Sequence, residues 1–81
     1  MKTEIYTTPT CPYCAMTKEL LDKQNISYVE HDVSVDEEAR HKMVQKSGQL
    51  GVPVTVINGE LIIGFDRKSL KEAVGKAKKA A

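Results

Sequence analysis

The chain has no tryptophan, one phenylalanine and only two cysteines among its 81 residues. Two cysteines cannot form the disulfide network of a small secreted domain, and a bridge across so short a loop removes little entropy from the unfolded chain. No apolar run is long enough to span a bilayer or to serve as a secretion signal, so we expect a cytoplasmic protein that binds no membrane. The formal net charge of +1 predicts no field that attracts nucleic acid.

The overall composition of the chain is typical of an ordinary globular domain. Hydrophobic residues make up 41% of the chain and charged residues 28%, which favours a folded protein over a disordered or fibrous one. A chain of 81 residues lies near the lower limit for a stable core without metals or crosslinks. We therefore expect a single domain over residues 1–81, present as a monomer.

The two cysteines lie two residues apart in the segment Cys11-Pro12-Tyr13-Cys14, between a strand pattern and a helix pattern. Pro12 suits the first position of a helix, which places Cys11 at the helix start and Cys14 one turn further in. Only a thiolate attacks a disulfide, and a helix dipole contributes about 0.3–1 kcal/mol toward stabilising one. The helix dipole alone is too weak to keep the Cys11 thiolate charged at neutral pH. We therefore expect the Tyr13 and Cys14 amides and the Cys14 thiol to donate hydrogen bonds to the Cys11 sulfur. The pair predicts a thiol-disulfide oxidoreductase in which Cys11 attacks and Cys14 resolves the mixed disulfide.

A zinc site is the alternative use of such a cysteine pair. It needs two more ligands, and the only histidines, His31 and His41, have no zinc-finger spacing and no second cysteine pair nearby. We therefore expect no metal and place both histidines at the surface or in loops. Lys18 lies one turn past Cys14, where assistance to proton transfer is one interpretation and a solvated helix lysine is the more common one.

The first half of the chain has the pattern of a strand, a helix and a second strand. Residues 5–8 read as the end of a strand that Pro9 halts, and residues 26–30 read as the second strand. Between them, a helix is expected from Pro12 to a stop at Asn25. Short connections between a strand, a helix and a second strand imply a parallel pair of strands with a right-handed crossover.

The second half adds a helix, a hairpin and a last helix. Carboxylates in residues 35–38 predict the start of a helix that ends at Ser47-Gly48. Residues 54–57 and 60–63 flank an Asn58-Gly59 turn, which is the strongest hairpin signal in the sequence. Asp66 is expected to cap the final helix, with Leu70, Ala73, Val74 and Ala77 on its inner face. The whole order predicts an α/β fold with a four-stranded mixed sheet and helices on both faces.

Three segments of the chain match motifs of one known family. They are residues 7–14 around the cysteines, Gly51-Val52-Pro53-Val54, and Ile63-Gly64-Phe65-Asp66. With the order of elements, they resemble the glutaredoxin branch of the thioredoxin superfamily, and most closely the short glutaredoxin-like proteins of the YruB type. The resemblance covers essentially the whole chain and implies a thioredoxin-like fold.

The resemblance also implies roles for residues around the cysteines. It implies a cis Val52-Pro53 bond that turns the Val52 amide and carbonyl toward the cysteines, where they pair with an extended substrate. It places Gly64, Phe65 and Asp66 at the γ-glutamyl end of glutathione. Pro12 and Tyr13 complete the substrate groove in this interpretation; Tyr13 is equally well explained as the first apolar contact of the helix.

The partners that the resemblance implies are protein disulfides or glutathione mixed disulfides. The electron donor would be glutathione or a flavoprotein like thioredoxin reductase, and no cofactor would be tightly bound. Three positions depart from the usual glutathione site: Thr8 replaces a lysine or arginine, Gly51 replaces a threonine, and Arg67 replaces an acidic residue. Charge-assisted hydrogen bonds are each worth about 1.5–3 kcal/mol, so we expect glutathione binding to be weak or absent.

Two further functions are compatible with the same motifs. One is a redoxin dedicated to a peroxidase or a ribonucleotide reductase, with which Gly64-Phe65 is compatible, although the chain lacks the tryptophan that such redoxins often carry. The other is a dimer that holds an iron–sulfur cluster. Pro12 argues against the cluster, because cluster-holding relatives usually have glycine at that position.

Overall fold

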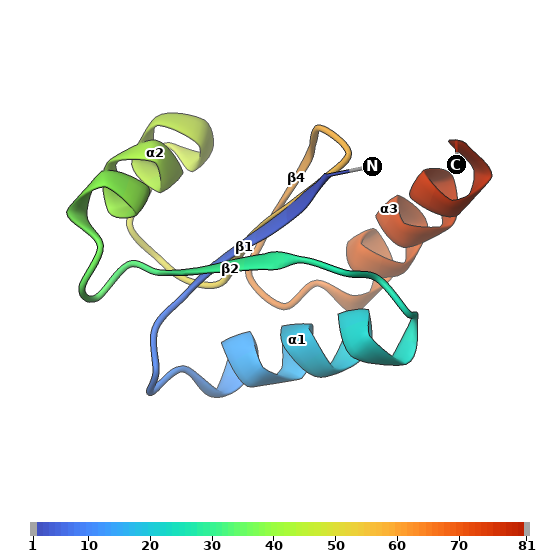
Figure 1. Cartoon of the computed structure of the whole chain (residues 1–81), viewed down its shortest axis with the longest axis horizontal. Coiled ribbons are helices and arrows are strands. Elements are labelled where there is room, and N and C mark those ends of the chain that lie inside the picture. The colour runs from blue at the N-terminus through green and yellow to red at the C-terminus, as the bar shows by residue number, and fades with distance from the viewer. Residues whose placement is uncertain (1, 81) are drawn as a thin grey trace.

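The computed structural model describes residues 2–80 and places a four-stranded mixed sheet between helices (Figure 1). The elements are β1 (Thr3–Thr7), α1 (Pro12–Lys23), β2 (Val29–Asp32), α2 (Glu37–Ser47), β3 (Val54–Ile57), β4 (Glu60–Ile63) and α3 (Arg67–Ala80). The strand order is β2-β1-β3-β4. Strand β1 pairs in parallel with β2 and antiparallel with β3, and β3 pairs antiparallel with β4. The predicted α/β fold and its mixed sheet are confirmed.

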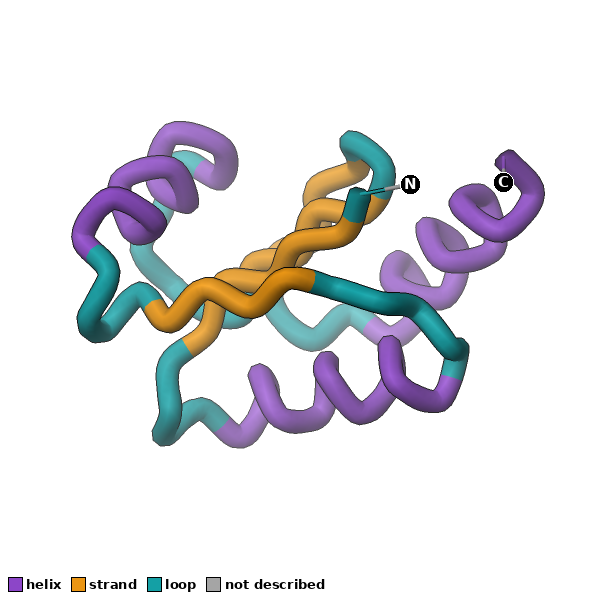
Figure 2. Tube along the Cα trace, viewed as in Figure 1, coloured by secondary structure: helices purple, strands orange, loops and turns teal. Residues whose placement is uncertain are grey.

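Helices cover both faces of the sheet, with α2 on one side and α1 and α3 on the other (Figure 2). Each face has its own apolar cluster. The cluster under α1 and α3 contains Leu21, Ile26, Ile57, Ile62, Leu70, Ala73, Val74 and Ala77. The cluster under α2 contains Tyr6, Val33, Ala39, Met43 and Val54. All four residues predicted for the inner face of the last helix belong to the first cluster, so the predicted amphipathic pattern of α3 is confirmed.

Local signals in the sequence account for the ends of α2 and for the hairpin. Asp36 caps α2, because its carboxylate accepts the Ala39 N–H at 3.0 Å. Gly48 ends the helix in the left-handed conformation, with φ of 74°. Asn58 and Gly59 both have positive φ in the turn between β3 and β4, which matches the twist of the paired strands.

The second strand begins later than the sequence pattern predicts, at Val29 instead of residue 26. Asn25 has φ of 59° at the end of α1, and the Ile26 N–H donates to the Leu21 carbonyl at 3.0 Å. The Ile26 amide therefore completes the end of the helix and is not available for the sheet. Ile26 is nevertheless buried in the core, which explains why its apolar character mimics a strand residue.

His31 does not lie in a loop, because it belongs to the edge strand β2, where its side chain is half-buried. Its ring stacks on Tyr6 with the centroids 4.9 Å apart, and its Nε2 lies 3.3 Å from Glu4 Oε2. The Tyr6 hydroxyl donates to the same carboxylate oxygen at 3.0 Å. Burial, followed by this hydrogen bond, raises the pKa of Tyr6 to about 12. His41 lies in α2 and is exposed, as predicted.

Within residues 2–80, no helix has both the length and the apolar character required to cross a membrane. The cytoplasmic location stays a prediction.

Candidate active site

Cys11 lies immediately before α1 and acts as its N-cap. Its backbone is extended, Pro12 follows as the first helical residue, and the Cys14 N–H donates to the Cys11 sulfur at 3.1 Å. This donor stabilises negative charge on the sulfur, as predicted for Cys14. The Tyr13 amide, which was expected to act in the same way, is not among the donors to this sulfur in the part of the chain that the structure describes. Cys11 is partly exposed, so a disulfide in solution can reach it.

Cys14 lies one turn further along α1 and is only 1% exposed. Burial is the main cause that raises the pKa of the Cys14 thiol to about 12, and its hydrogen bond with Cys11 raises it further. The Thr8 backbone and the charge of Lys18 act in the opposite direction. Both cysteines are free thiols here, and Cys14 keeps its proton at neutral pH while Cys11 faces the solvent.

Lys18 is not a freely solvated helix lysine. Its Nζ lies 3.0 Å from Glu30 Oε2 on β2, and its side chain is 34% exposed. The buried Thr7 hydroxyl donates to the same carboxylate oxygen at 2.7 Å. This Thr7 bond and then the Lys18 ammonium lower the pKa of Glu30, while the carboxylate raises the pKa of Lys18. The ion pair connects α1 with β2 and keeps a positive charge near Cys14.

The second part of the site is the loop between α2 and β3. The Val52-Pro53 peptide bond is cis, as the resemblance implied. The Cys11 thiol lies 3.9 Å from the Val52 carbonyl oxygen and donates to it. Pro53 is buried, and its carbonyl accepts the Gly64 N–H at 2.8 Å. The structure therefore brings the cysteines, Val52, Pro53 and Gly64 together.

Phe65 and Asp66 follow Gly64 but face different surroundings. Phe65 is half-buried against the cluster under α1 and α3, and the Arg67 guanidinium lies 5.8 Å from its ring centroid. Asp66 is exposed and caps α3: it accepts the Ser69 N–H at 3.1 Å and the Ser69 hydroxyl at 2.8 Å. Hydrogen bonds from the backbone and the side chain of Ser69 lower the pKa of Asp66.

Tyr13 is 60% exposed at the start of α1. Its exposure rules out a role as the first apolar core contact of the helix, and a place beside the substrate stays a prediction. Thr8, next to the site, accepts the Cys11 N–H on its carbonyl at 3.4 Å. A glutathione site is expected to have a lysine or arginine at position 8, where this chain has threonine. The Arg67 guanidinium lies over the Phe65 ring.

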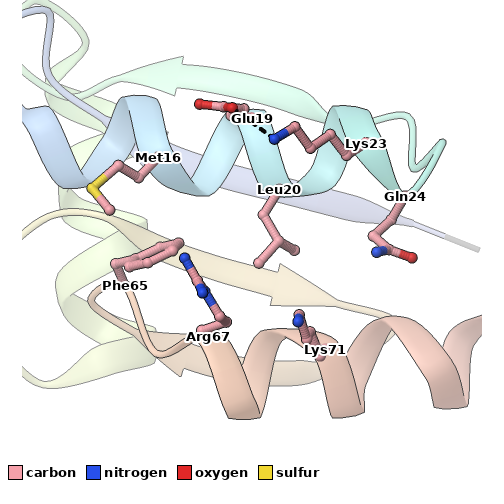
Figure 3. A pocket seen from close by; sticks show the side chains of 8 residues that line it. All are labelled: Met16, Glu19, Leu20, Lys23, Gln24, Phe65, Arg67 and Lys71. Carbon is pink, nitrogen blue, oxygen red and sulfur yellow. Dashed lines mark ion pairs between the residues drawn. The ribbon is translucent and has the colours of Figure 1, made fainter.

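A groove of about 320 Å³ runs between α1 and α3, with Phe65 and Met16 at one end (Figure 3). It is lined by Met16, Glu19, Leu20, Lys23, Gln24, Phe65, Arg67 and Lys71. Three of these residues are apolar and three are basic; one of the cations, Lys23, pairs with Glu19 at 3.0 Å. Neither cysteine lines this groove, which is therefore separate from the cysteine pair.

Sequence reasoning missed Gln49, which organises the loop before Pro53. Its side chain makes two hydrogen bonds with the Gly51 backbone, at 2.7 and 3.0 Å. The only hint in the sequence is a glutamine two residues before a glycine, a pattern too common to carry a prediction.

No group of three or more histidine, cysteine, aspartate and glutamate side chains that could hold a metal ion occurs among residues 2–80.

Comparisons with known proteins agree with this geometry. The glutaredoxin family model matches residues 3–62. The chain is 42% identical over 73 residues to an uncharacterized glutaredoxin-like 8.6 kDa protein in the rubredoxin operon of Clostridium pasteurianum, covering 90% of this chain and 97% of that protein. It is 38% identical over 63 residues to glutaredoxin 3 of Escherichia coli K12, covering 78% of this chain and 76% of that one.

Solved structures show the same similarity in three dimensions. A thioredoxin-like protein known from its crystal structure superposes with a TM-score of 0.84 at 38% sequence identity. The match covers 89% of this chain and 99% of that protein. The predicted thioredoxin-like fold is therefore confirmed.

Proposed function

The chain belongs to the glutaredoxin family of thiol-disulfide oxidoreductases, and we propose that it reduces protein disulfides or glutathione mixed disulfides by a dithiol mechanism with Cys11 and Cys14. The observation that carries the proposal is the contrast between the two sulfurs. Cys11 is accessible and receives the Cys14 N–H at 3.1 Å, whereas Cys14 is buried and protonated.

In the first step, the Cys11 thiolate attacks one sulfur of the substrate disulfide. A bond forms between Cys11 and that sulfur, the substrate S–S bond breaks, and the departing thiolate takes a proton from solvent. The Cys14 N–H, aimed at the Cys11 sulfur, stabilises the attacking anion.

In the second step, Cys14 loses its proton to solvent and attacks the Cys11 sulfur. The Cys11–Cys14 disulfide forms, and the second substrate sulfur leaves and becomes a thiol. The substrate has then gained two electrons and two protons, which a donor must return to the protein. The charge of Lys18 favours the Cys14 thiolate in this step, since it lowers the pKa of Cys14.

Substrate binding is assigned to the surface around the two sulfurs. Val52 offers its backbone beside Cys11, and Pro12 and the exposed Tyr13 follow Cys11 at the start of α1. The turn at Gly64, Phe65 and Asp66 adjoins Pro53 through the Gly64 hydrogen bond and is assigned to the same surface.

The donor is glutathione or a flavoprotein like thioredoxin reductase, and a direct comparison decides between them. Reduction of a peptide disulfide is measured with NADPH consumption, once with glutathione and its reductase and once with a thioredoxin reductase. Because the cationic side chain is missing at Thr8 and Arg67 reverses a charge, we expect the flavoprotein to support faster turnover than glutathione does.

Turnover with neither donor, while dithiothreitol also fails to drive reduction of the peptide disulfide, contradicts the proposed function. Faster turnover with glutathione leaves the dithiol mechanism in place and assigns glutathione as the donor. The matched control is Gln45→Ala, an exposed substitution on α2 away from both sulfurs.

A further inference from the structure

The loop between α2 and β3 is closed on itself by the side chain of Gln49. The Gly51 N–H donates to Gln49 Oε1 at 2.7 Å, and Gln49 Nε2 donates to the Gly51 carbonyl at 3.0 Å. Both backbone hydrogen-bonding groups of Gly51 are thereby occupied. We call this pair of bonds the Gln49 clamp.

The Gln49 clamp is attached to the core through Ser47. The Ser47 hydroxyl lies 2.7 Å from the carbonyl oxygen of Met43, a fully buried residue, and 3.0 Å from the carbonyl oxygen of Gln49. The Gln49 N–H also lies 3.4 Å from the Ser47 oxygen. The last turn of α2 thus fixes the backbone from which the Gln49 side chain extends.

The clamp also explains why residue 51 is a glycine. A Cβ added to Gly51 would lie 2.6 Å from Gln49 Oε1, which is too close for any side chain at that position while the clamp is closed. Backbone conformation does not require glycine there, because Gly51 is not among the glycines with positive φ, which are Gly48, Gly59 and Gly64. Gln49 and Gly51 therefore form one unit.

The clamp determines which backbone groups remain for a substrate. Pro53 has no N–H, and its carbonyl is taken by Gly64. Among residues 2–80, the Val52 N–H makes no hydrogen bond, and the Val52 carbonyl accepts only the 3.9 Å contact from Cys11. In the segment 51–53, Val52 alone can pair with an extended polypeptide at the attacking sulfur.

From these contacts we propose that Gln49 is a positioning residue that holds Val52 opposite Cys11, and so gives the protein its preference for disulfides carried on an extended polypeptide. The proposal rests on the function proposed above. Gln49 does not touch the reacting atoms. It acts through Gly51, by keeping the next residue in the geometry that a substrate backbone needs.

The test compares a disulfide carried on a peptide backbone with one that has no peptide backbone. One is an extended peptide whose cysteine is in mixed disulfide with 5-thio-2-nitrobenzoate, and the other is the same mixed disulfide of 2-mercaptoethanol. Reduced protein is mixed with each, and release of the coloured thiolate gives two second-order rate constants. Their ratio, peptide over mercaptoethanol, is the preference for a polypeptide.

For Gln49→Ala, we expect this ratio to fall about three- to tenfold, since two exposed neutral hydrogen bonds are lost and tenfold corresponds to about 1.4 kcal/mol. Gln49→Glu keeps the acceptor for the Gly51 N–H and loses the donor, so its ratio should lie between those of Gln49→Ala and the unmodified protein. Gly51→Ala displaces the Gln49 side chain and should lower the ratio by a similar factor. Because both changes open the same clamp, the double variant should show no additional loss.

Gln45→Ala is the matched control, because it removes an exposed glutamine from the same helix without touching the loop. A ratio for Gln49→Ala within about twofold of the unmodified protein, or about 0.4 kcal/mol, overturns the proposal. An equal fall in both rate constants also overturns it, because the clamp would then support the site as a whole. If the unmodified protein reacts with neither disulfide, the proposed function fails and not the clamp alone.

Discussion

The sulfur of Cys11 lies 3.9 Å from the carbonyl oxygen of Val52, a residue 41 positions further along the chain. Cys11 is held by the start of α1, whereas Val52 is held by the loop that follows α2 on the opposite face of the sheet. The Cys11 sulfur and the backbone beside it are therefore positioned by two separate helix layers. The predictions below test the two sulfurs and the packing that holds them.

The two cysteines should behave differently when each is replaced by serine. Cys11→Ser removes the accessible sulfur, so reductase turnover should fall to background. Cys14→Ser leaves attack intact and removes the resolving thiol, so Cys11 should accumulate as a mixed disulfide with the substrate. Mass spectrometry of the intact protein and of its peptides locates the adduct. An adduct on Cys14 in the Cys11→Ser variant would mean that the attacking sulfur is misassigned.

The stability of the reduced protein should depend on pH through Cys14. Its pKa in the folded protein is about 12, above the ordinary 9.0, so the folded state binds this proton more tightly than the unfolded state does. The resulting stability is fully present below about pH 9 and is lost as the pH rises from there toward 12, with a slope of at most about 1.4 kcal/mol per pH unit.

Urea unfolding of the reduced protein on both sides of pH 9 measures this slope. Other groups also titrate in that range, and Tyr6 is one of them. Cys14→Ser is therefore the control, because serine does not titrate there and every other group is retained. Identical slopes for the two proteins would contradict the assignment of the buried proton to Cys14.

The Glu30 carboxylate should stabilise the folded protein at pH values at which it is ionised. The Thr7 hydroxyl and then Lys18 lower its pKa below the ordinary 4.5, so its contribution is present above about pH 4.5 and is lost as the pH falls below that value. The Glu30 side chain is 39% exposed, and solvent screening limits the loss in Glu30→Gln to about 0.5–1 kcal/mol at neutral pH.

Chemical denaturation at neutral pH and near pH 3 checks the size and the sign of this contribution. Glu38→Gln is the matched control, because Glu38 pairs with Lys42 at 3.6 Å and is 82% exposed. Its effect should be smaller than that of Glu30→Gln. A Glu30→Gln protein that loses as much stability as the unmodified protein on acidification would exclude the carboxylate as the source.

Leu21 should be a major contributor to the stability of α1. It is fully buried in the cluster under α1 and α3, so Leu21→Ala leaves a cavity and should cost about 2–5 kcal/mol of unfolding free energy. Leu50→Ala deletes the same atoms from a side chain that is 68% exposed and should change stability by less than about 0.5 kcal/mol. Thermal or urea unfolding compares the two. Equal losses would show that burial of Leu21 does not support the helix.

Much of the fold could be predicted from short stretches of the chain, because their signals act locally. Pro12 favours a helix start, Asp36 offers a carboxylate to free amides, and Asn58-Gly59 permits the positive φ of a tight turn. The predicted start of β2 at residue 26 was wrong. The Ile26 side chain is buried in the core, but its N–H donates to the Leu21 carbonyl at the end of α1 and not to the sheet. The type of a residue indicates whether its side chain is buried more directly than it indicates where its backbone forms hydrogen bonds.

The amino-acid sequence by itself determined the family and the place of the cysteine pair at a helix start, since the spacing of Cys11 and Cys14 and the helix that follows them are properties of a few adjacent residues. Only the tertiary structure decided what surrounds these sulfurs. The contact of Cys11 with Val52, the Lys18–Glu30 pair and the Gln49 clamp depend on where the packed elements place polar groups. Hydrogen bonds act over about 3 Å, so residues that are ordinary in the sequence become functional only when packing sets that distance.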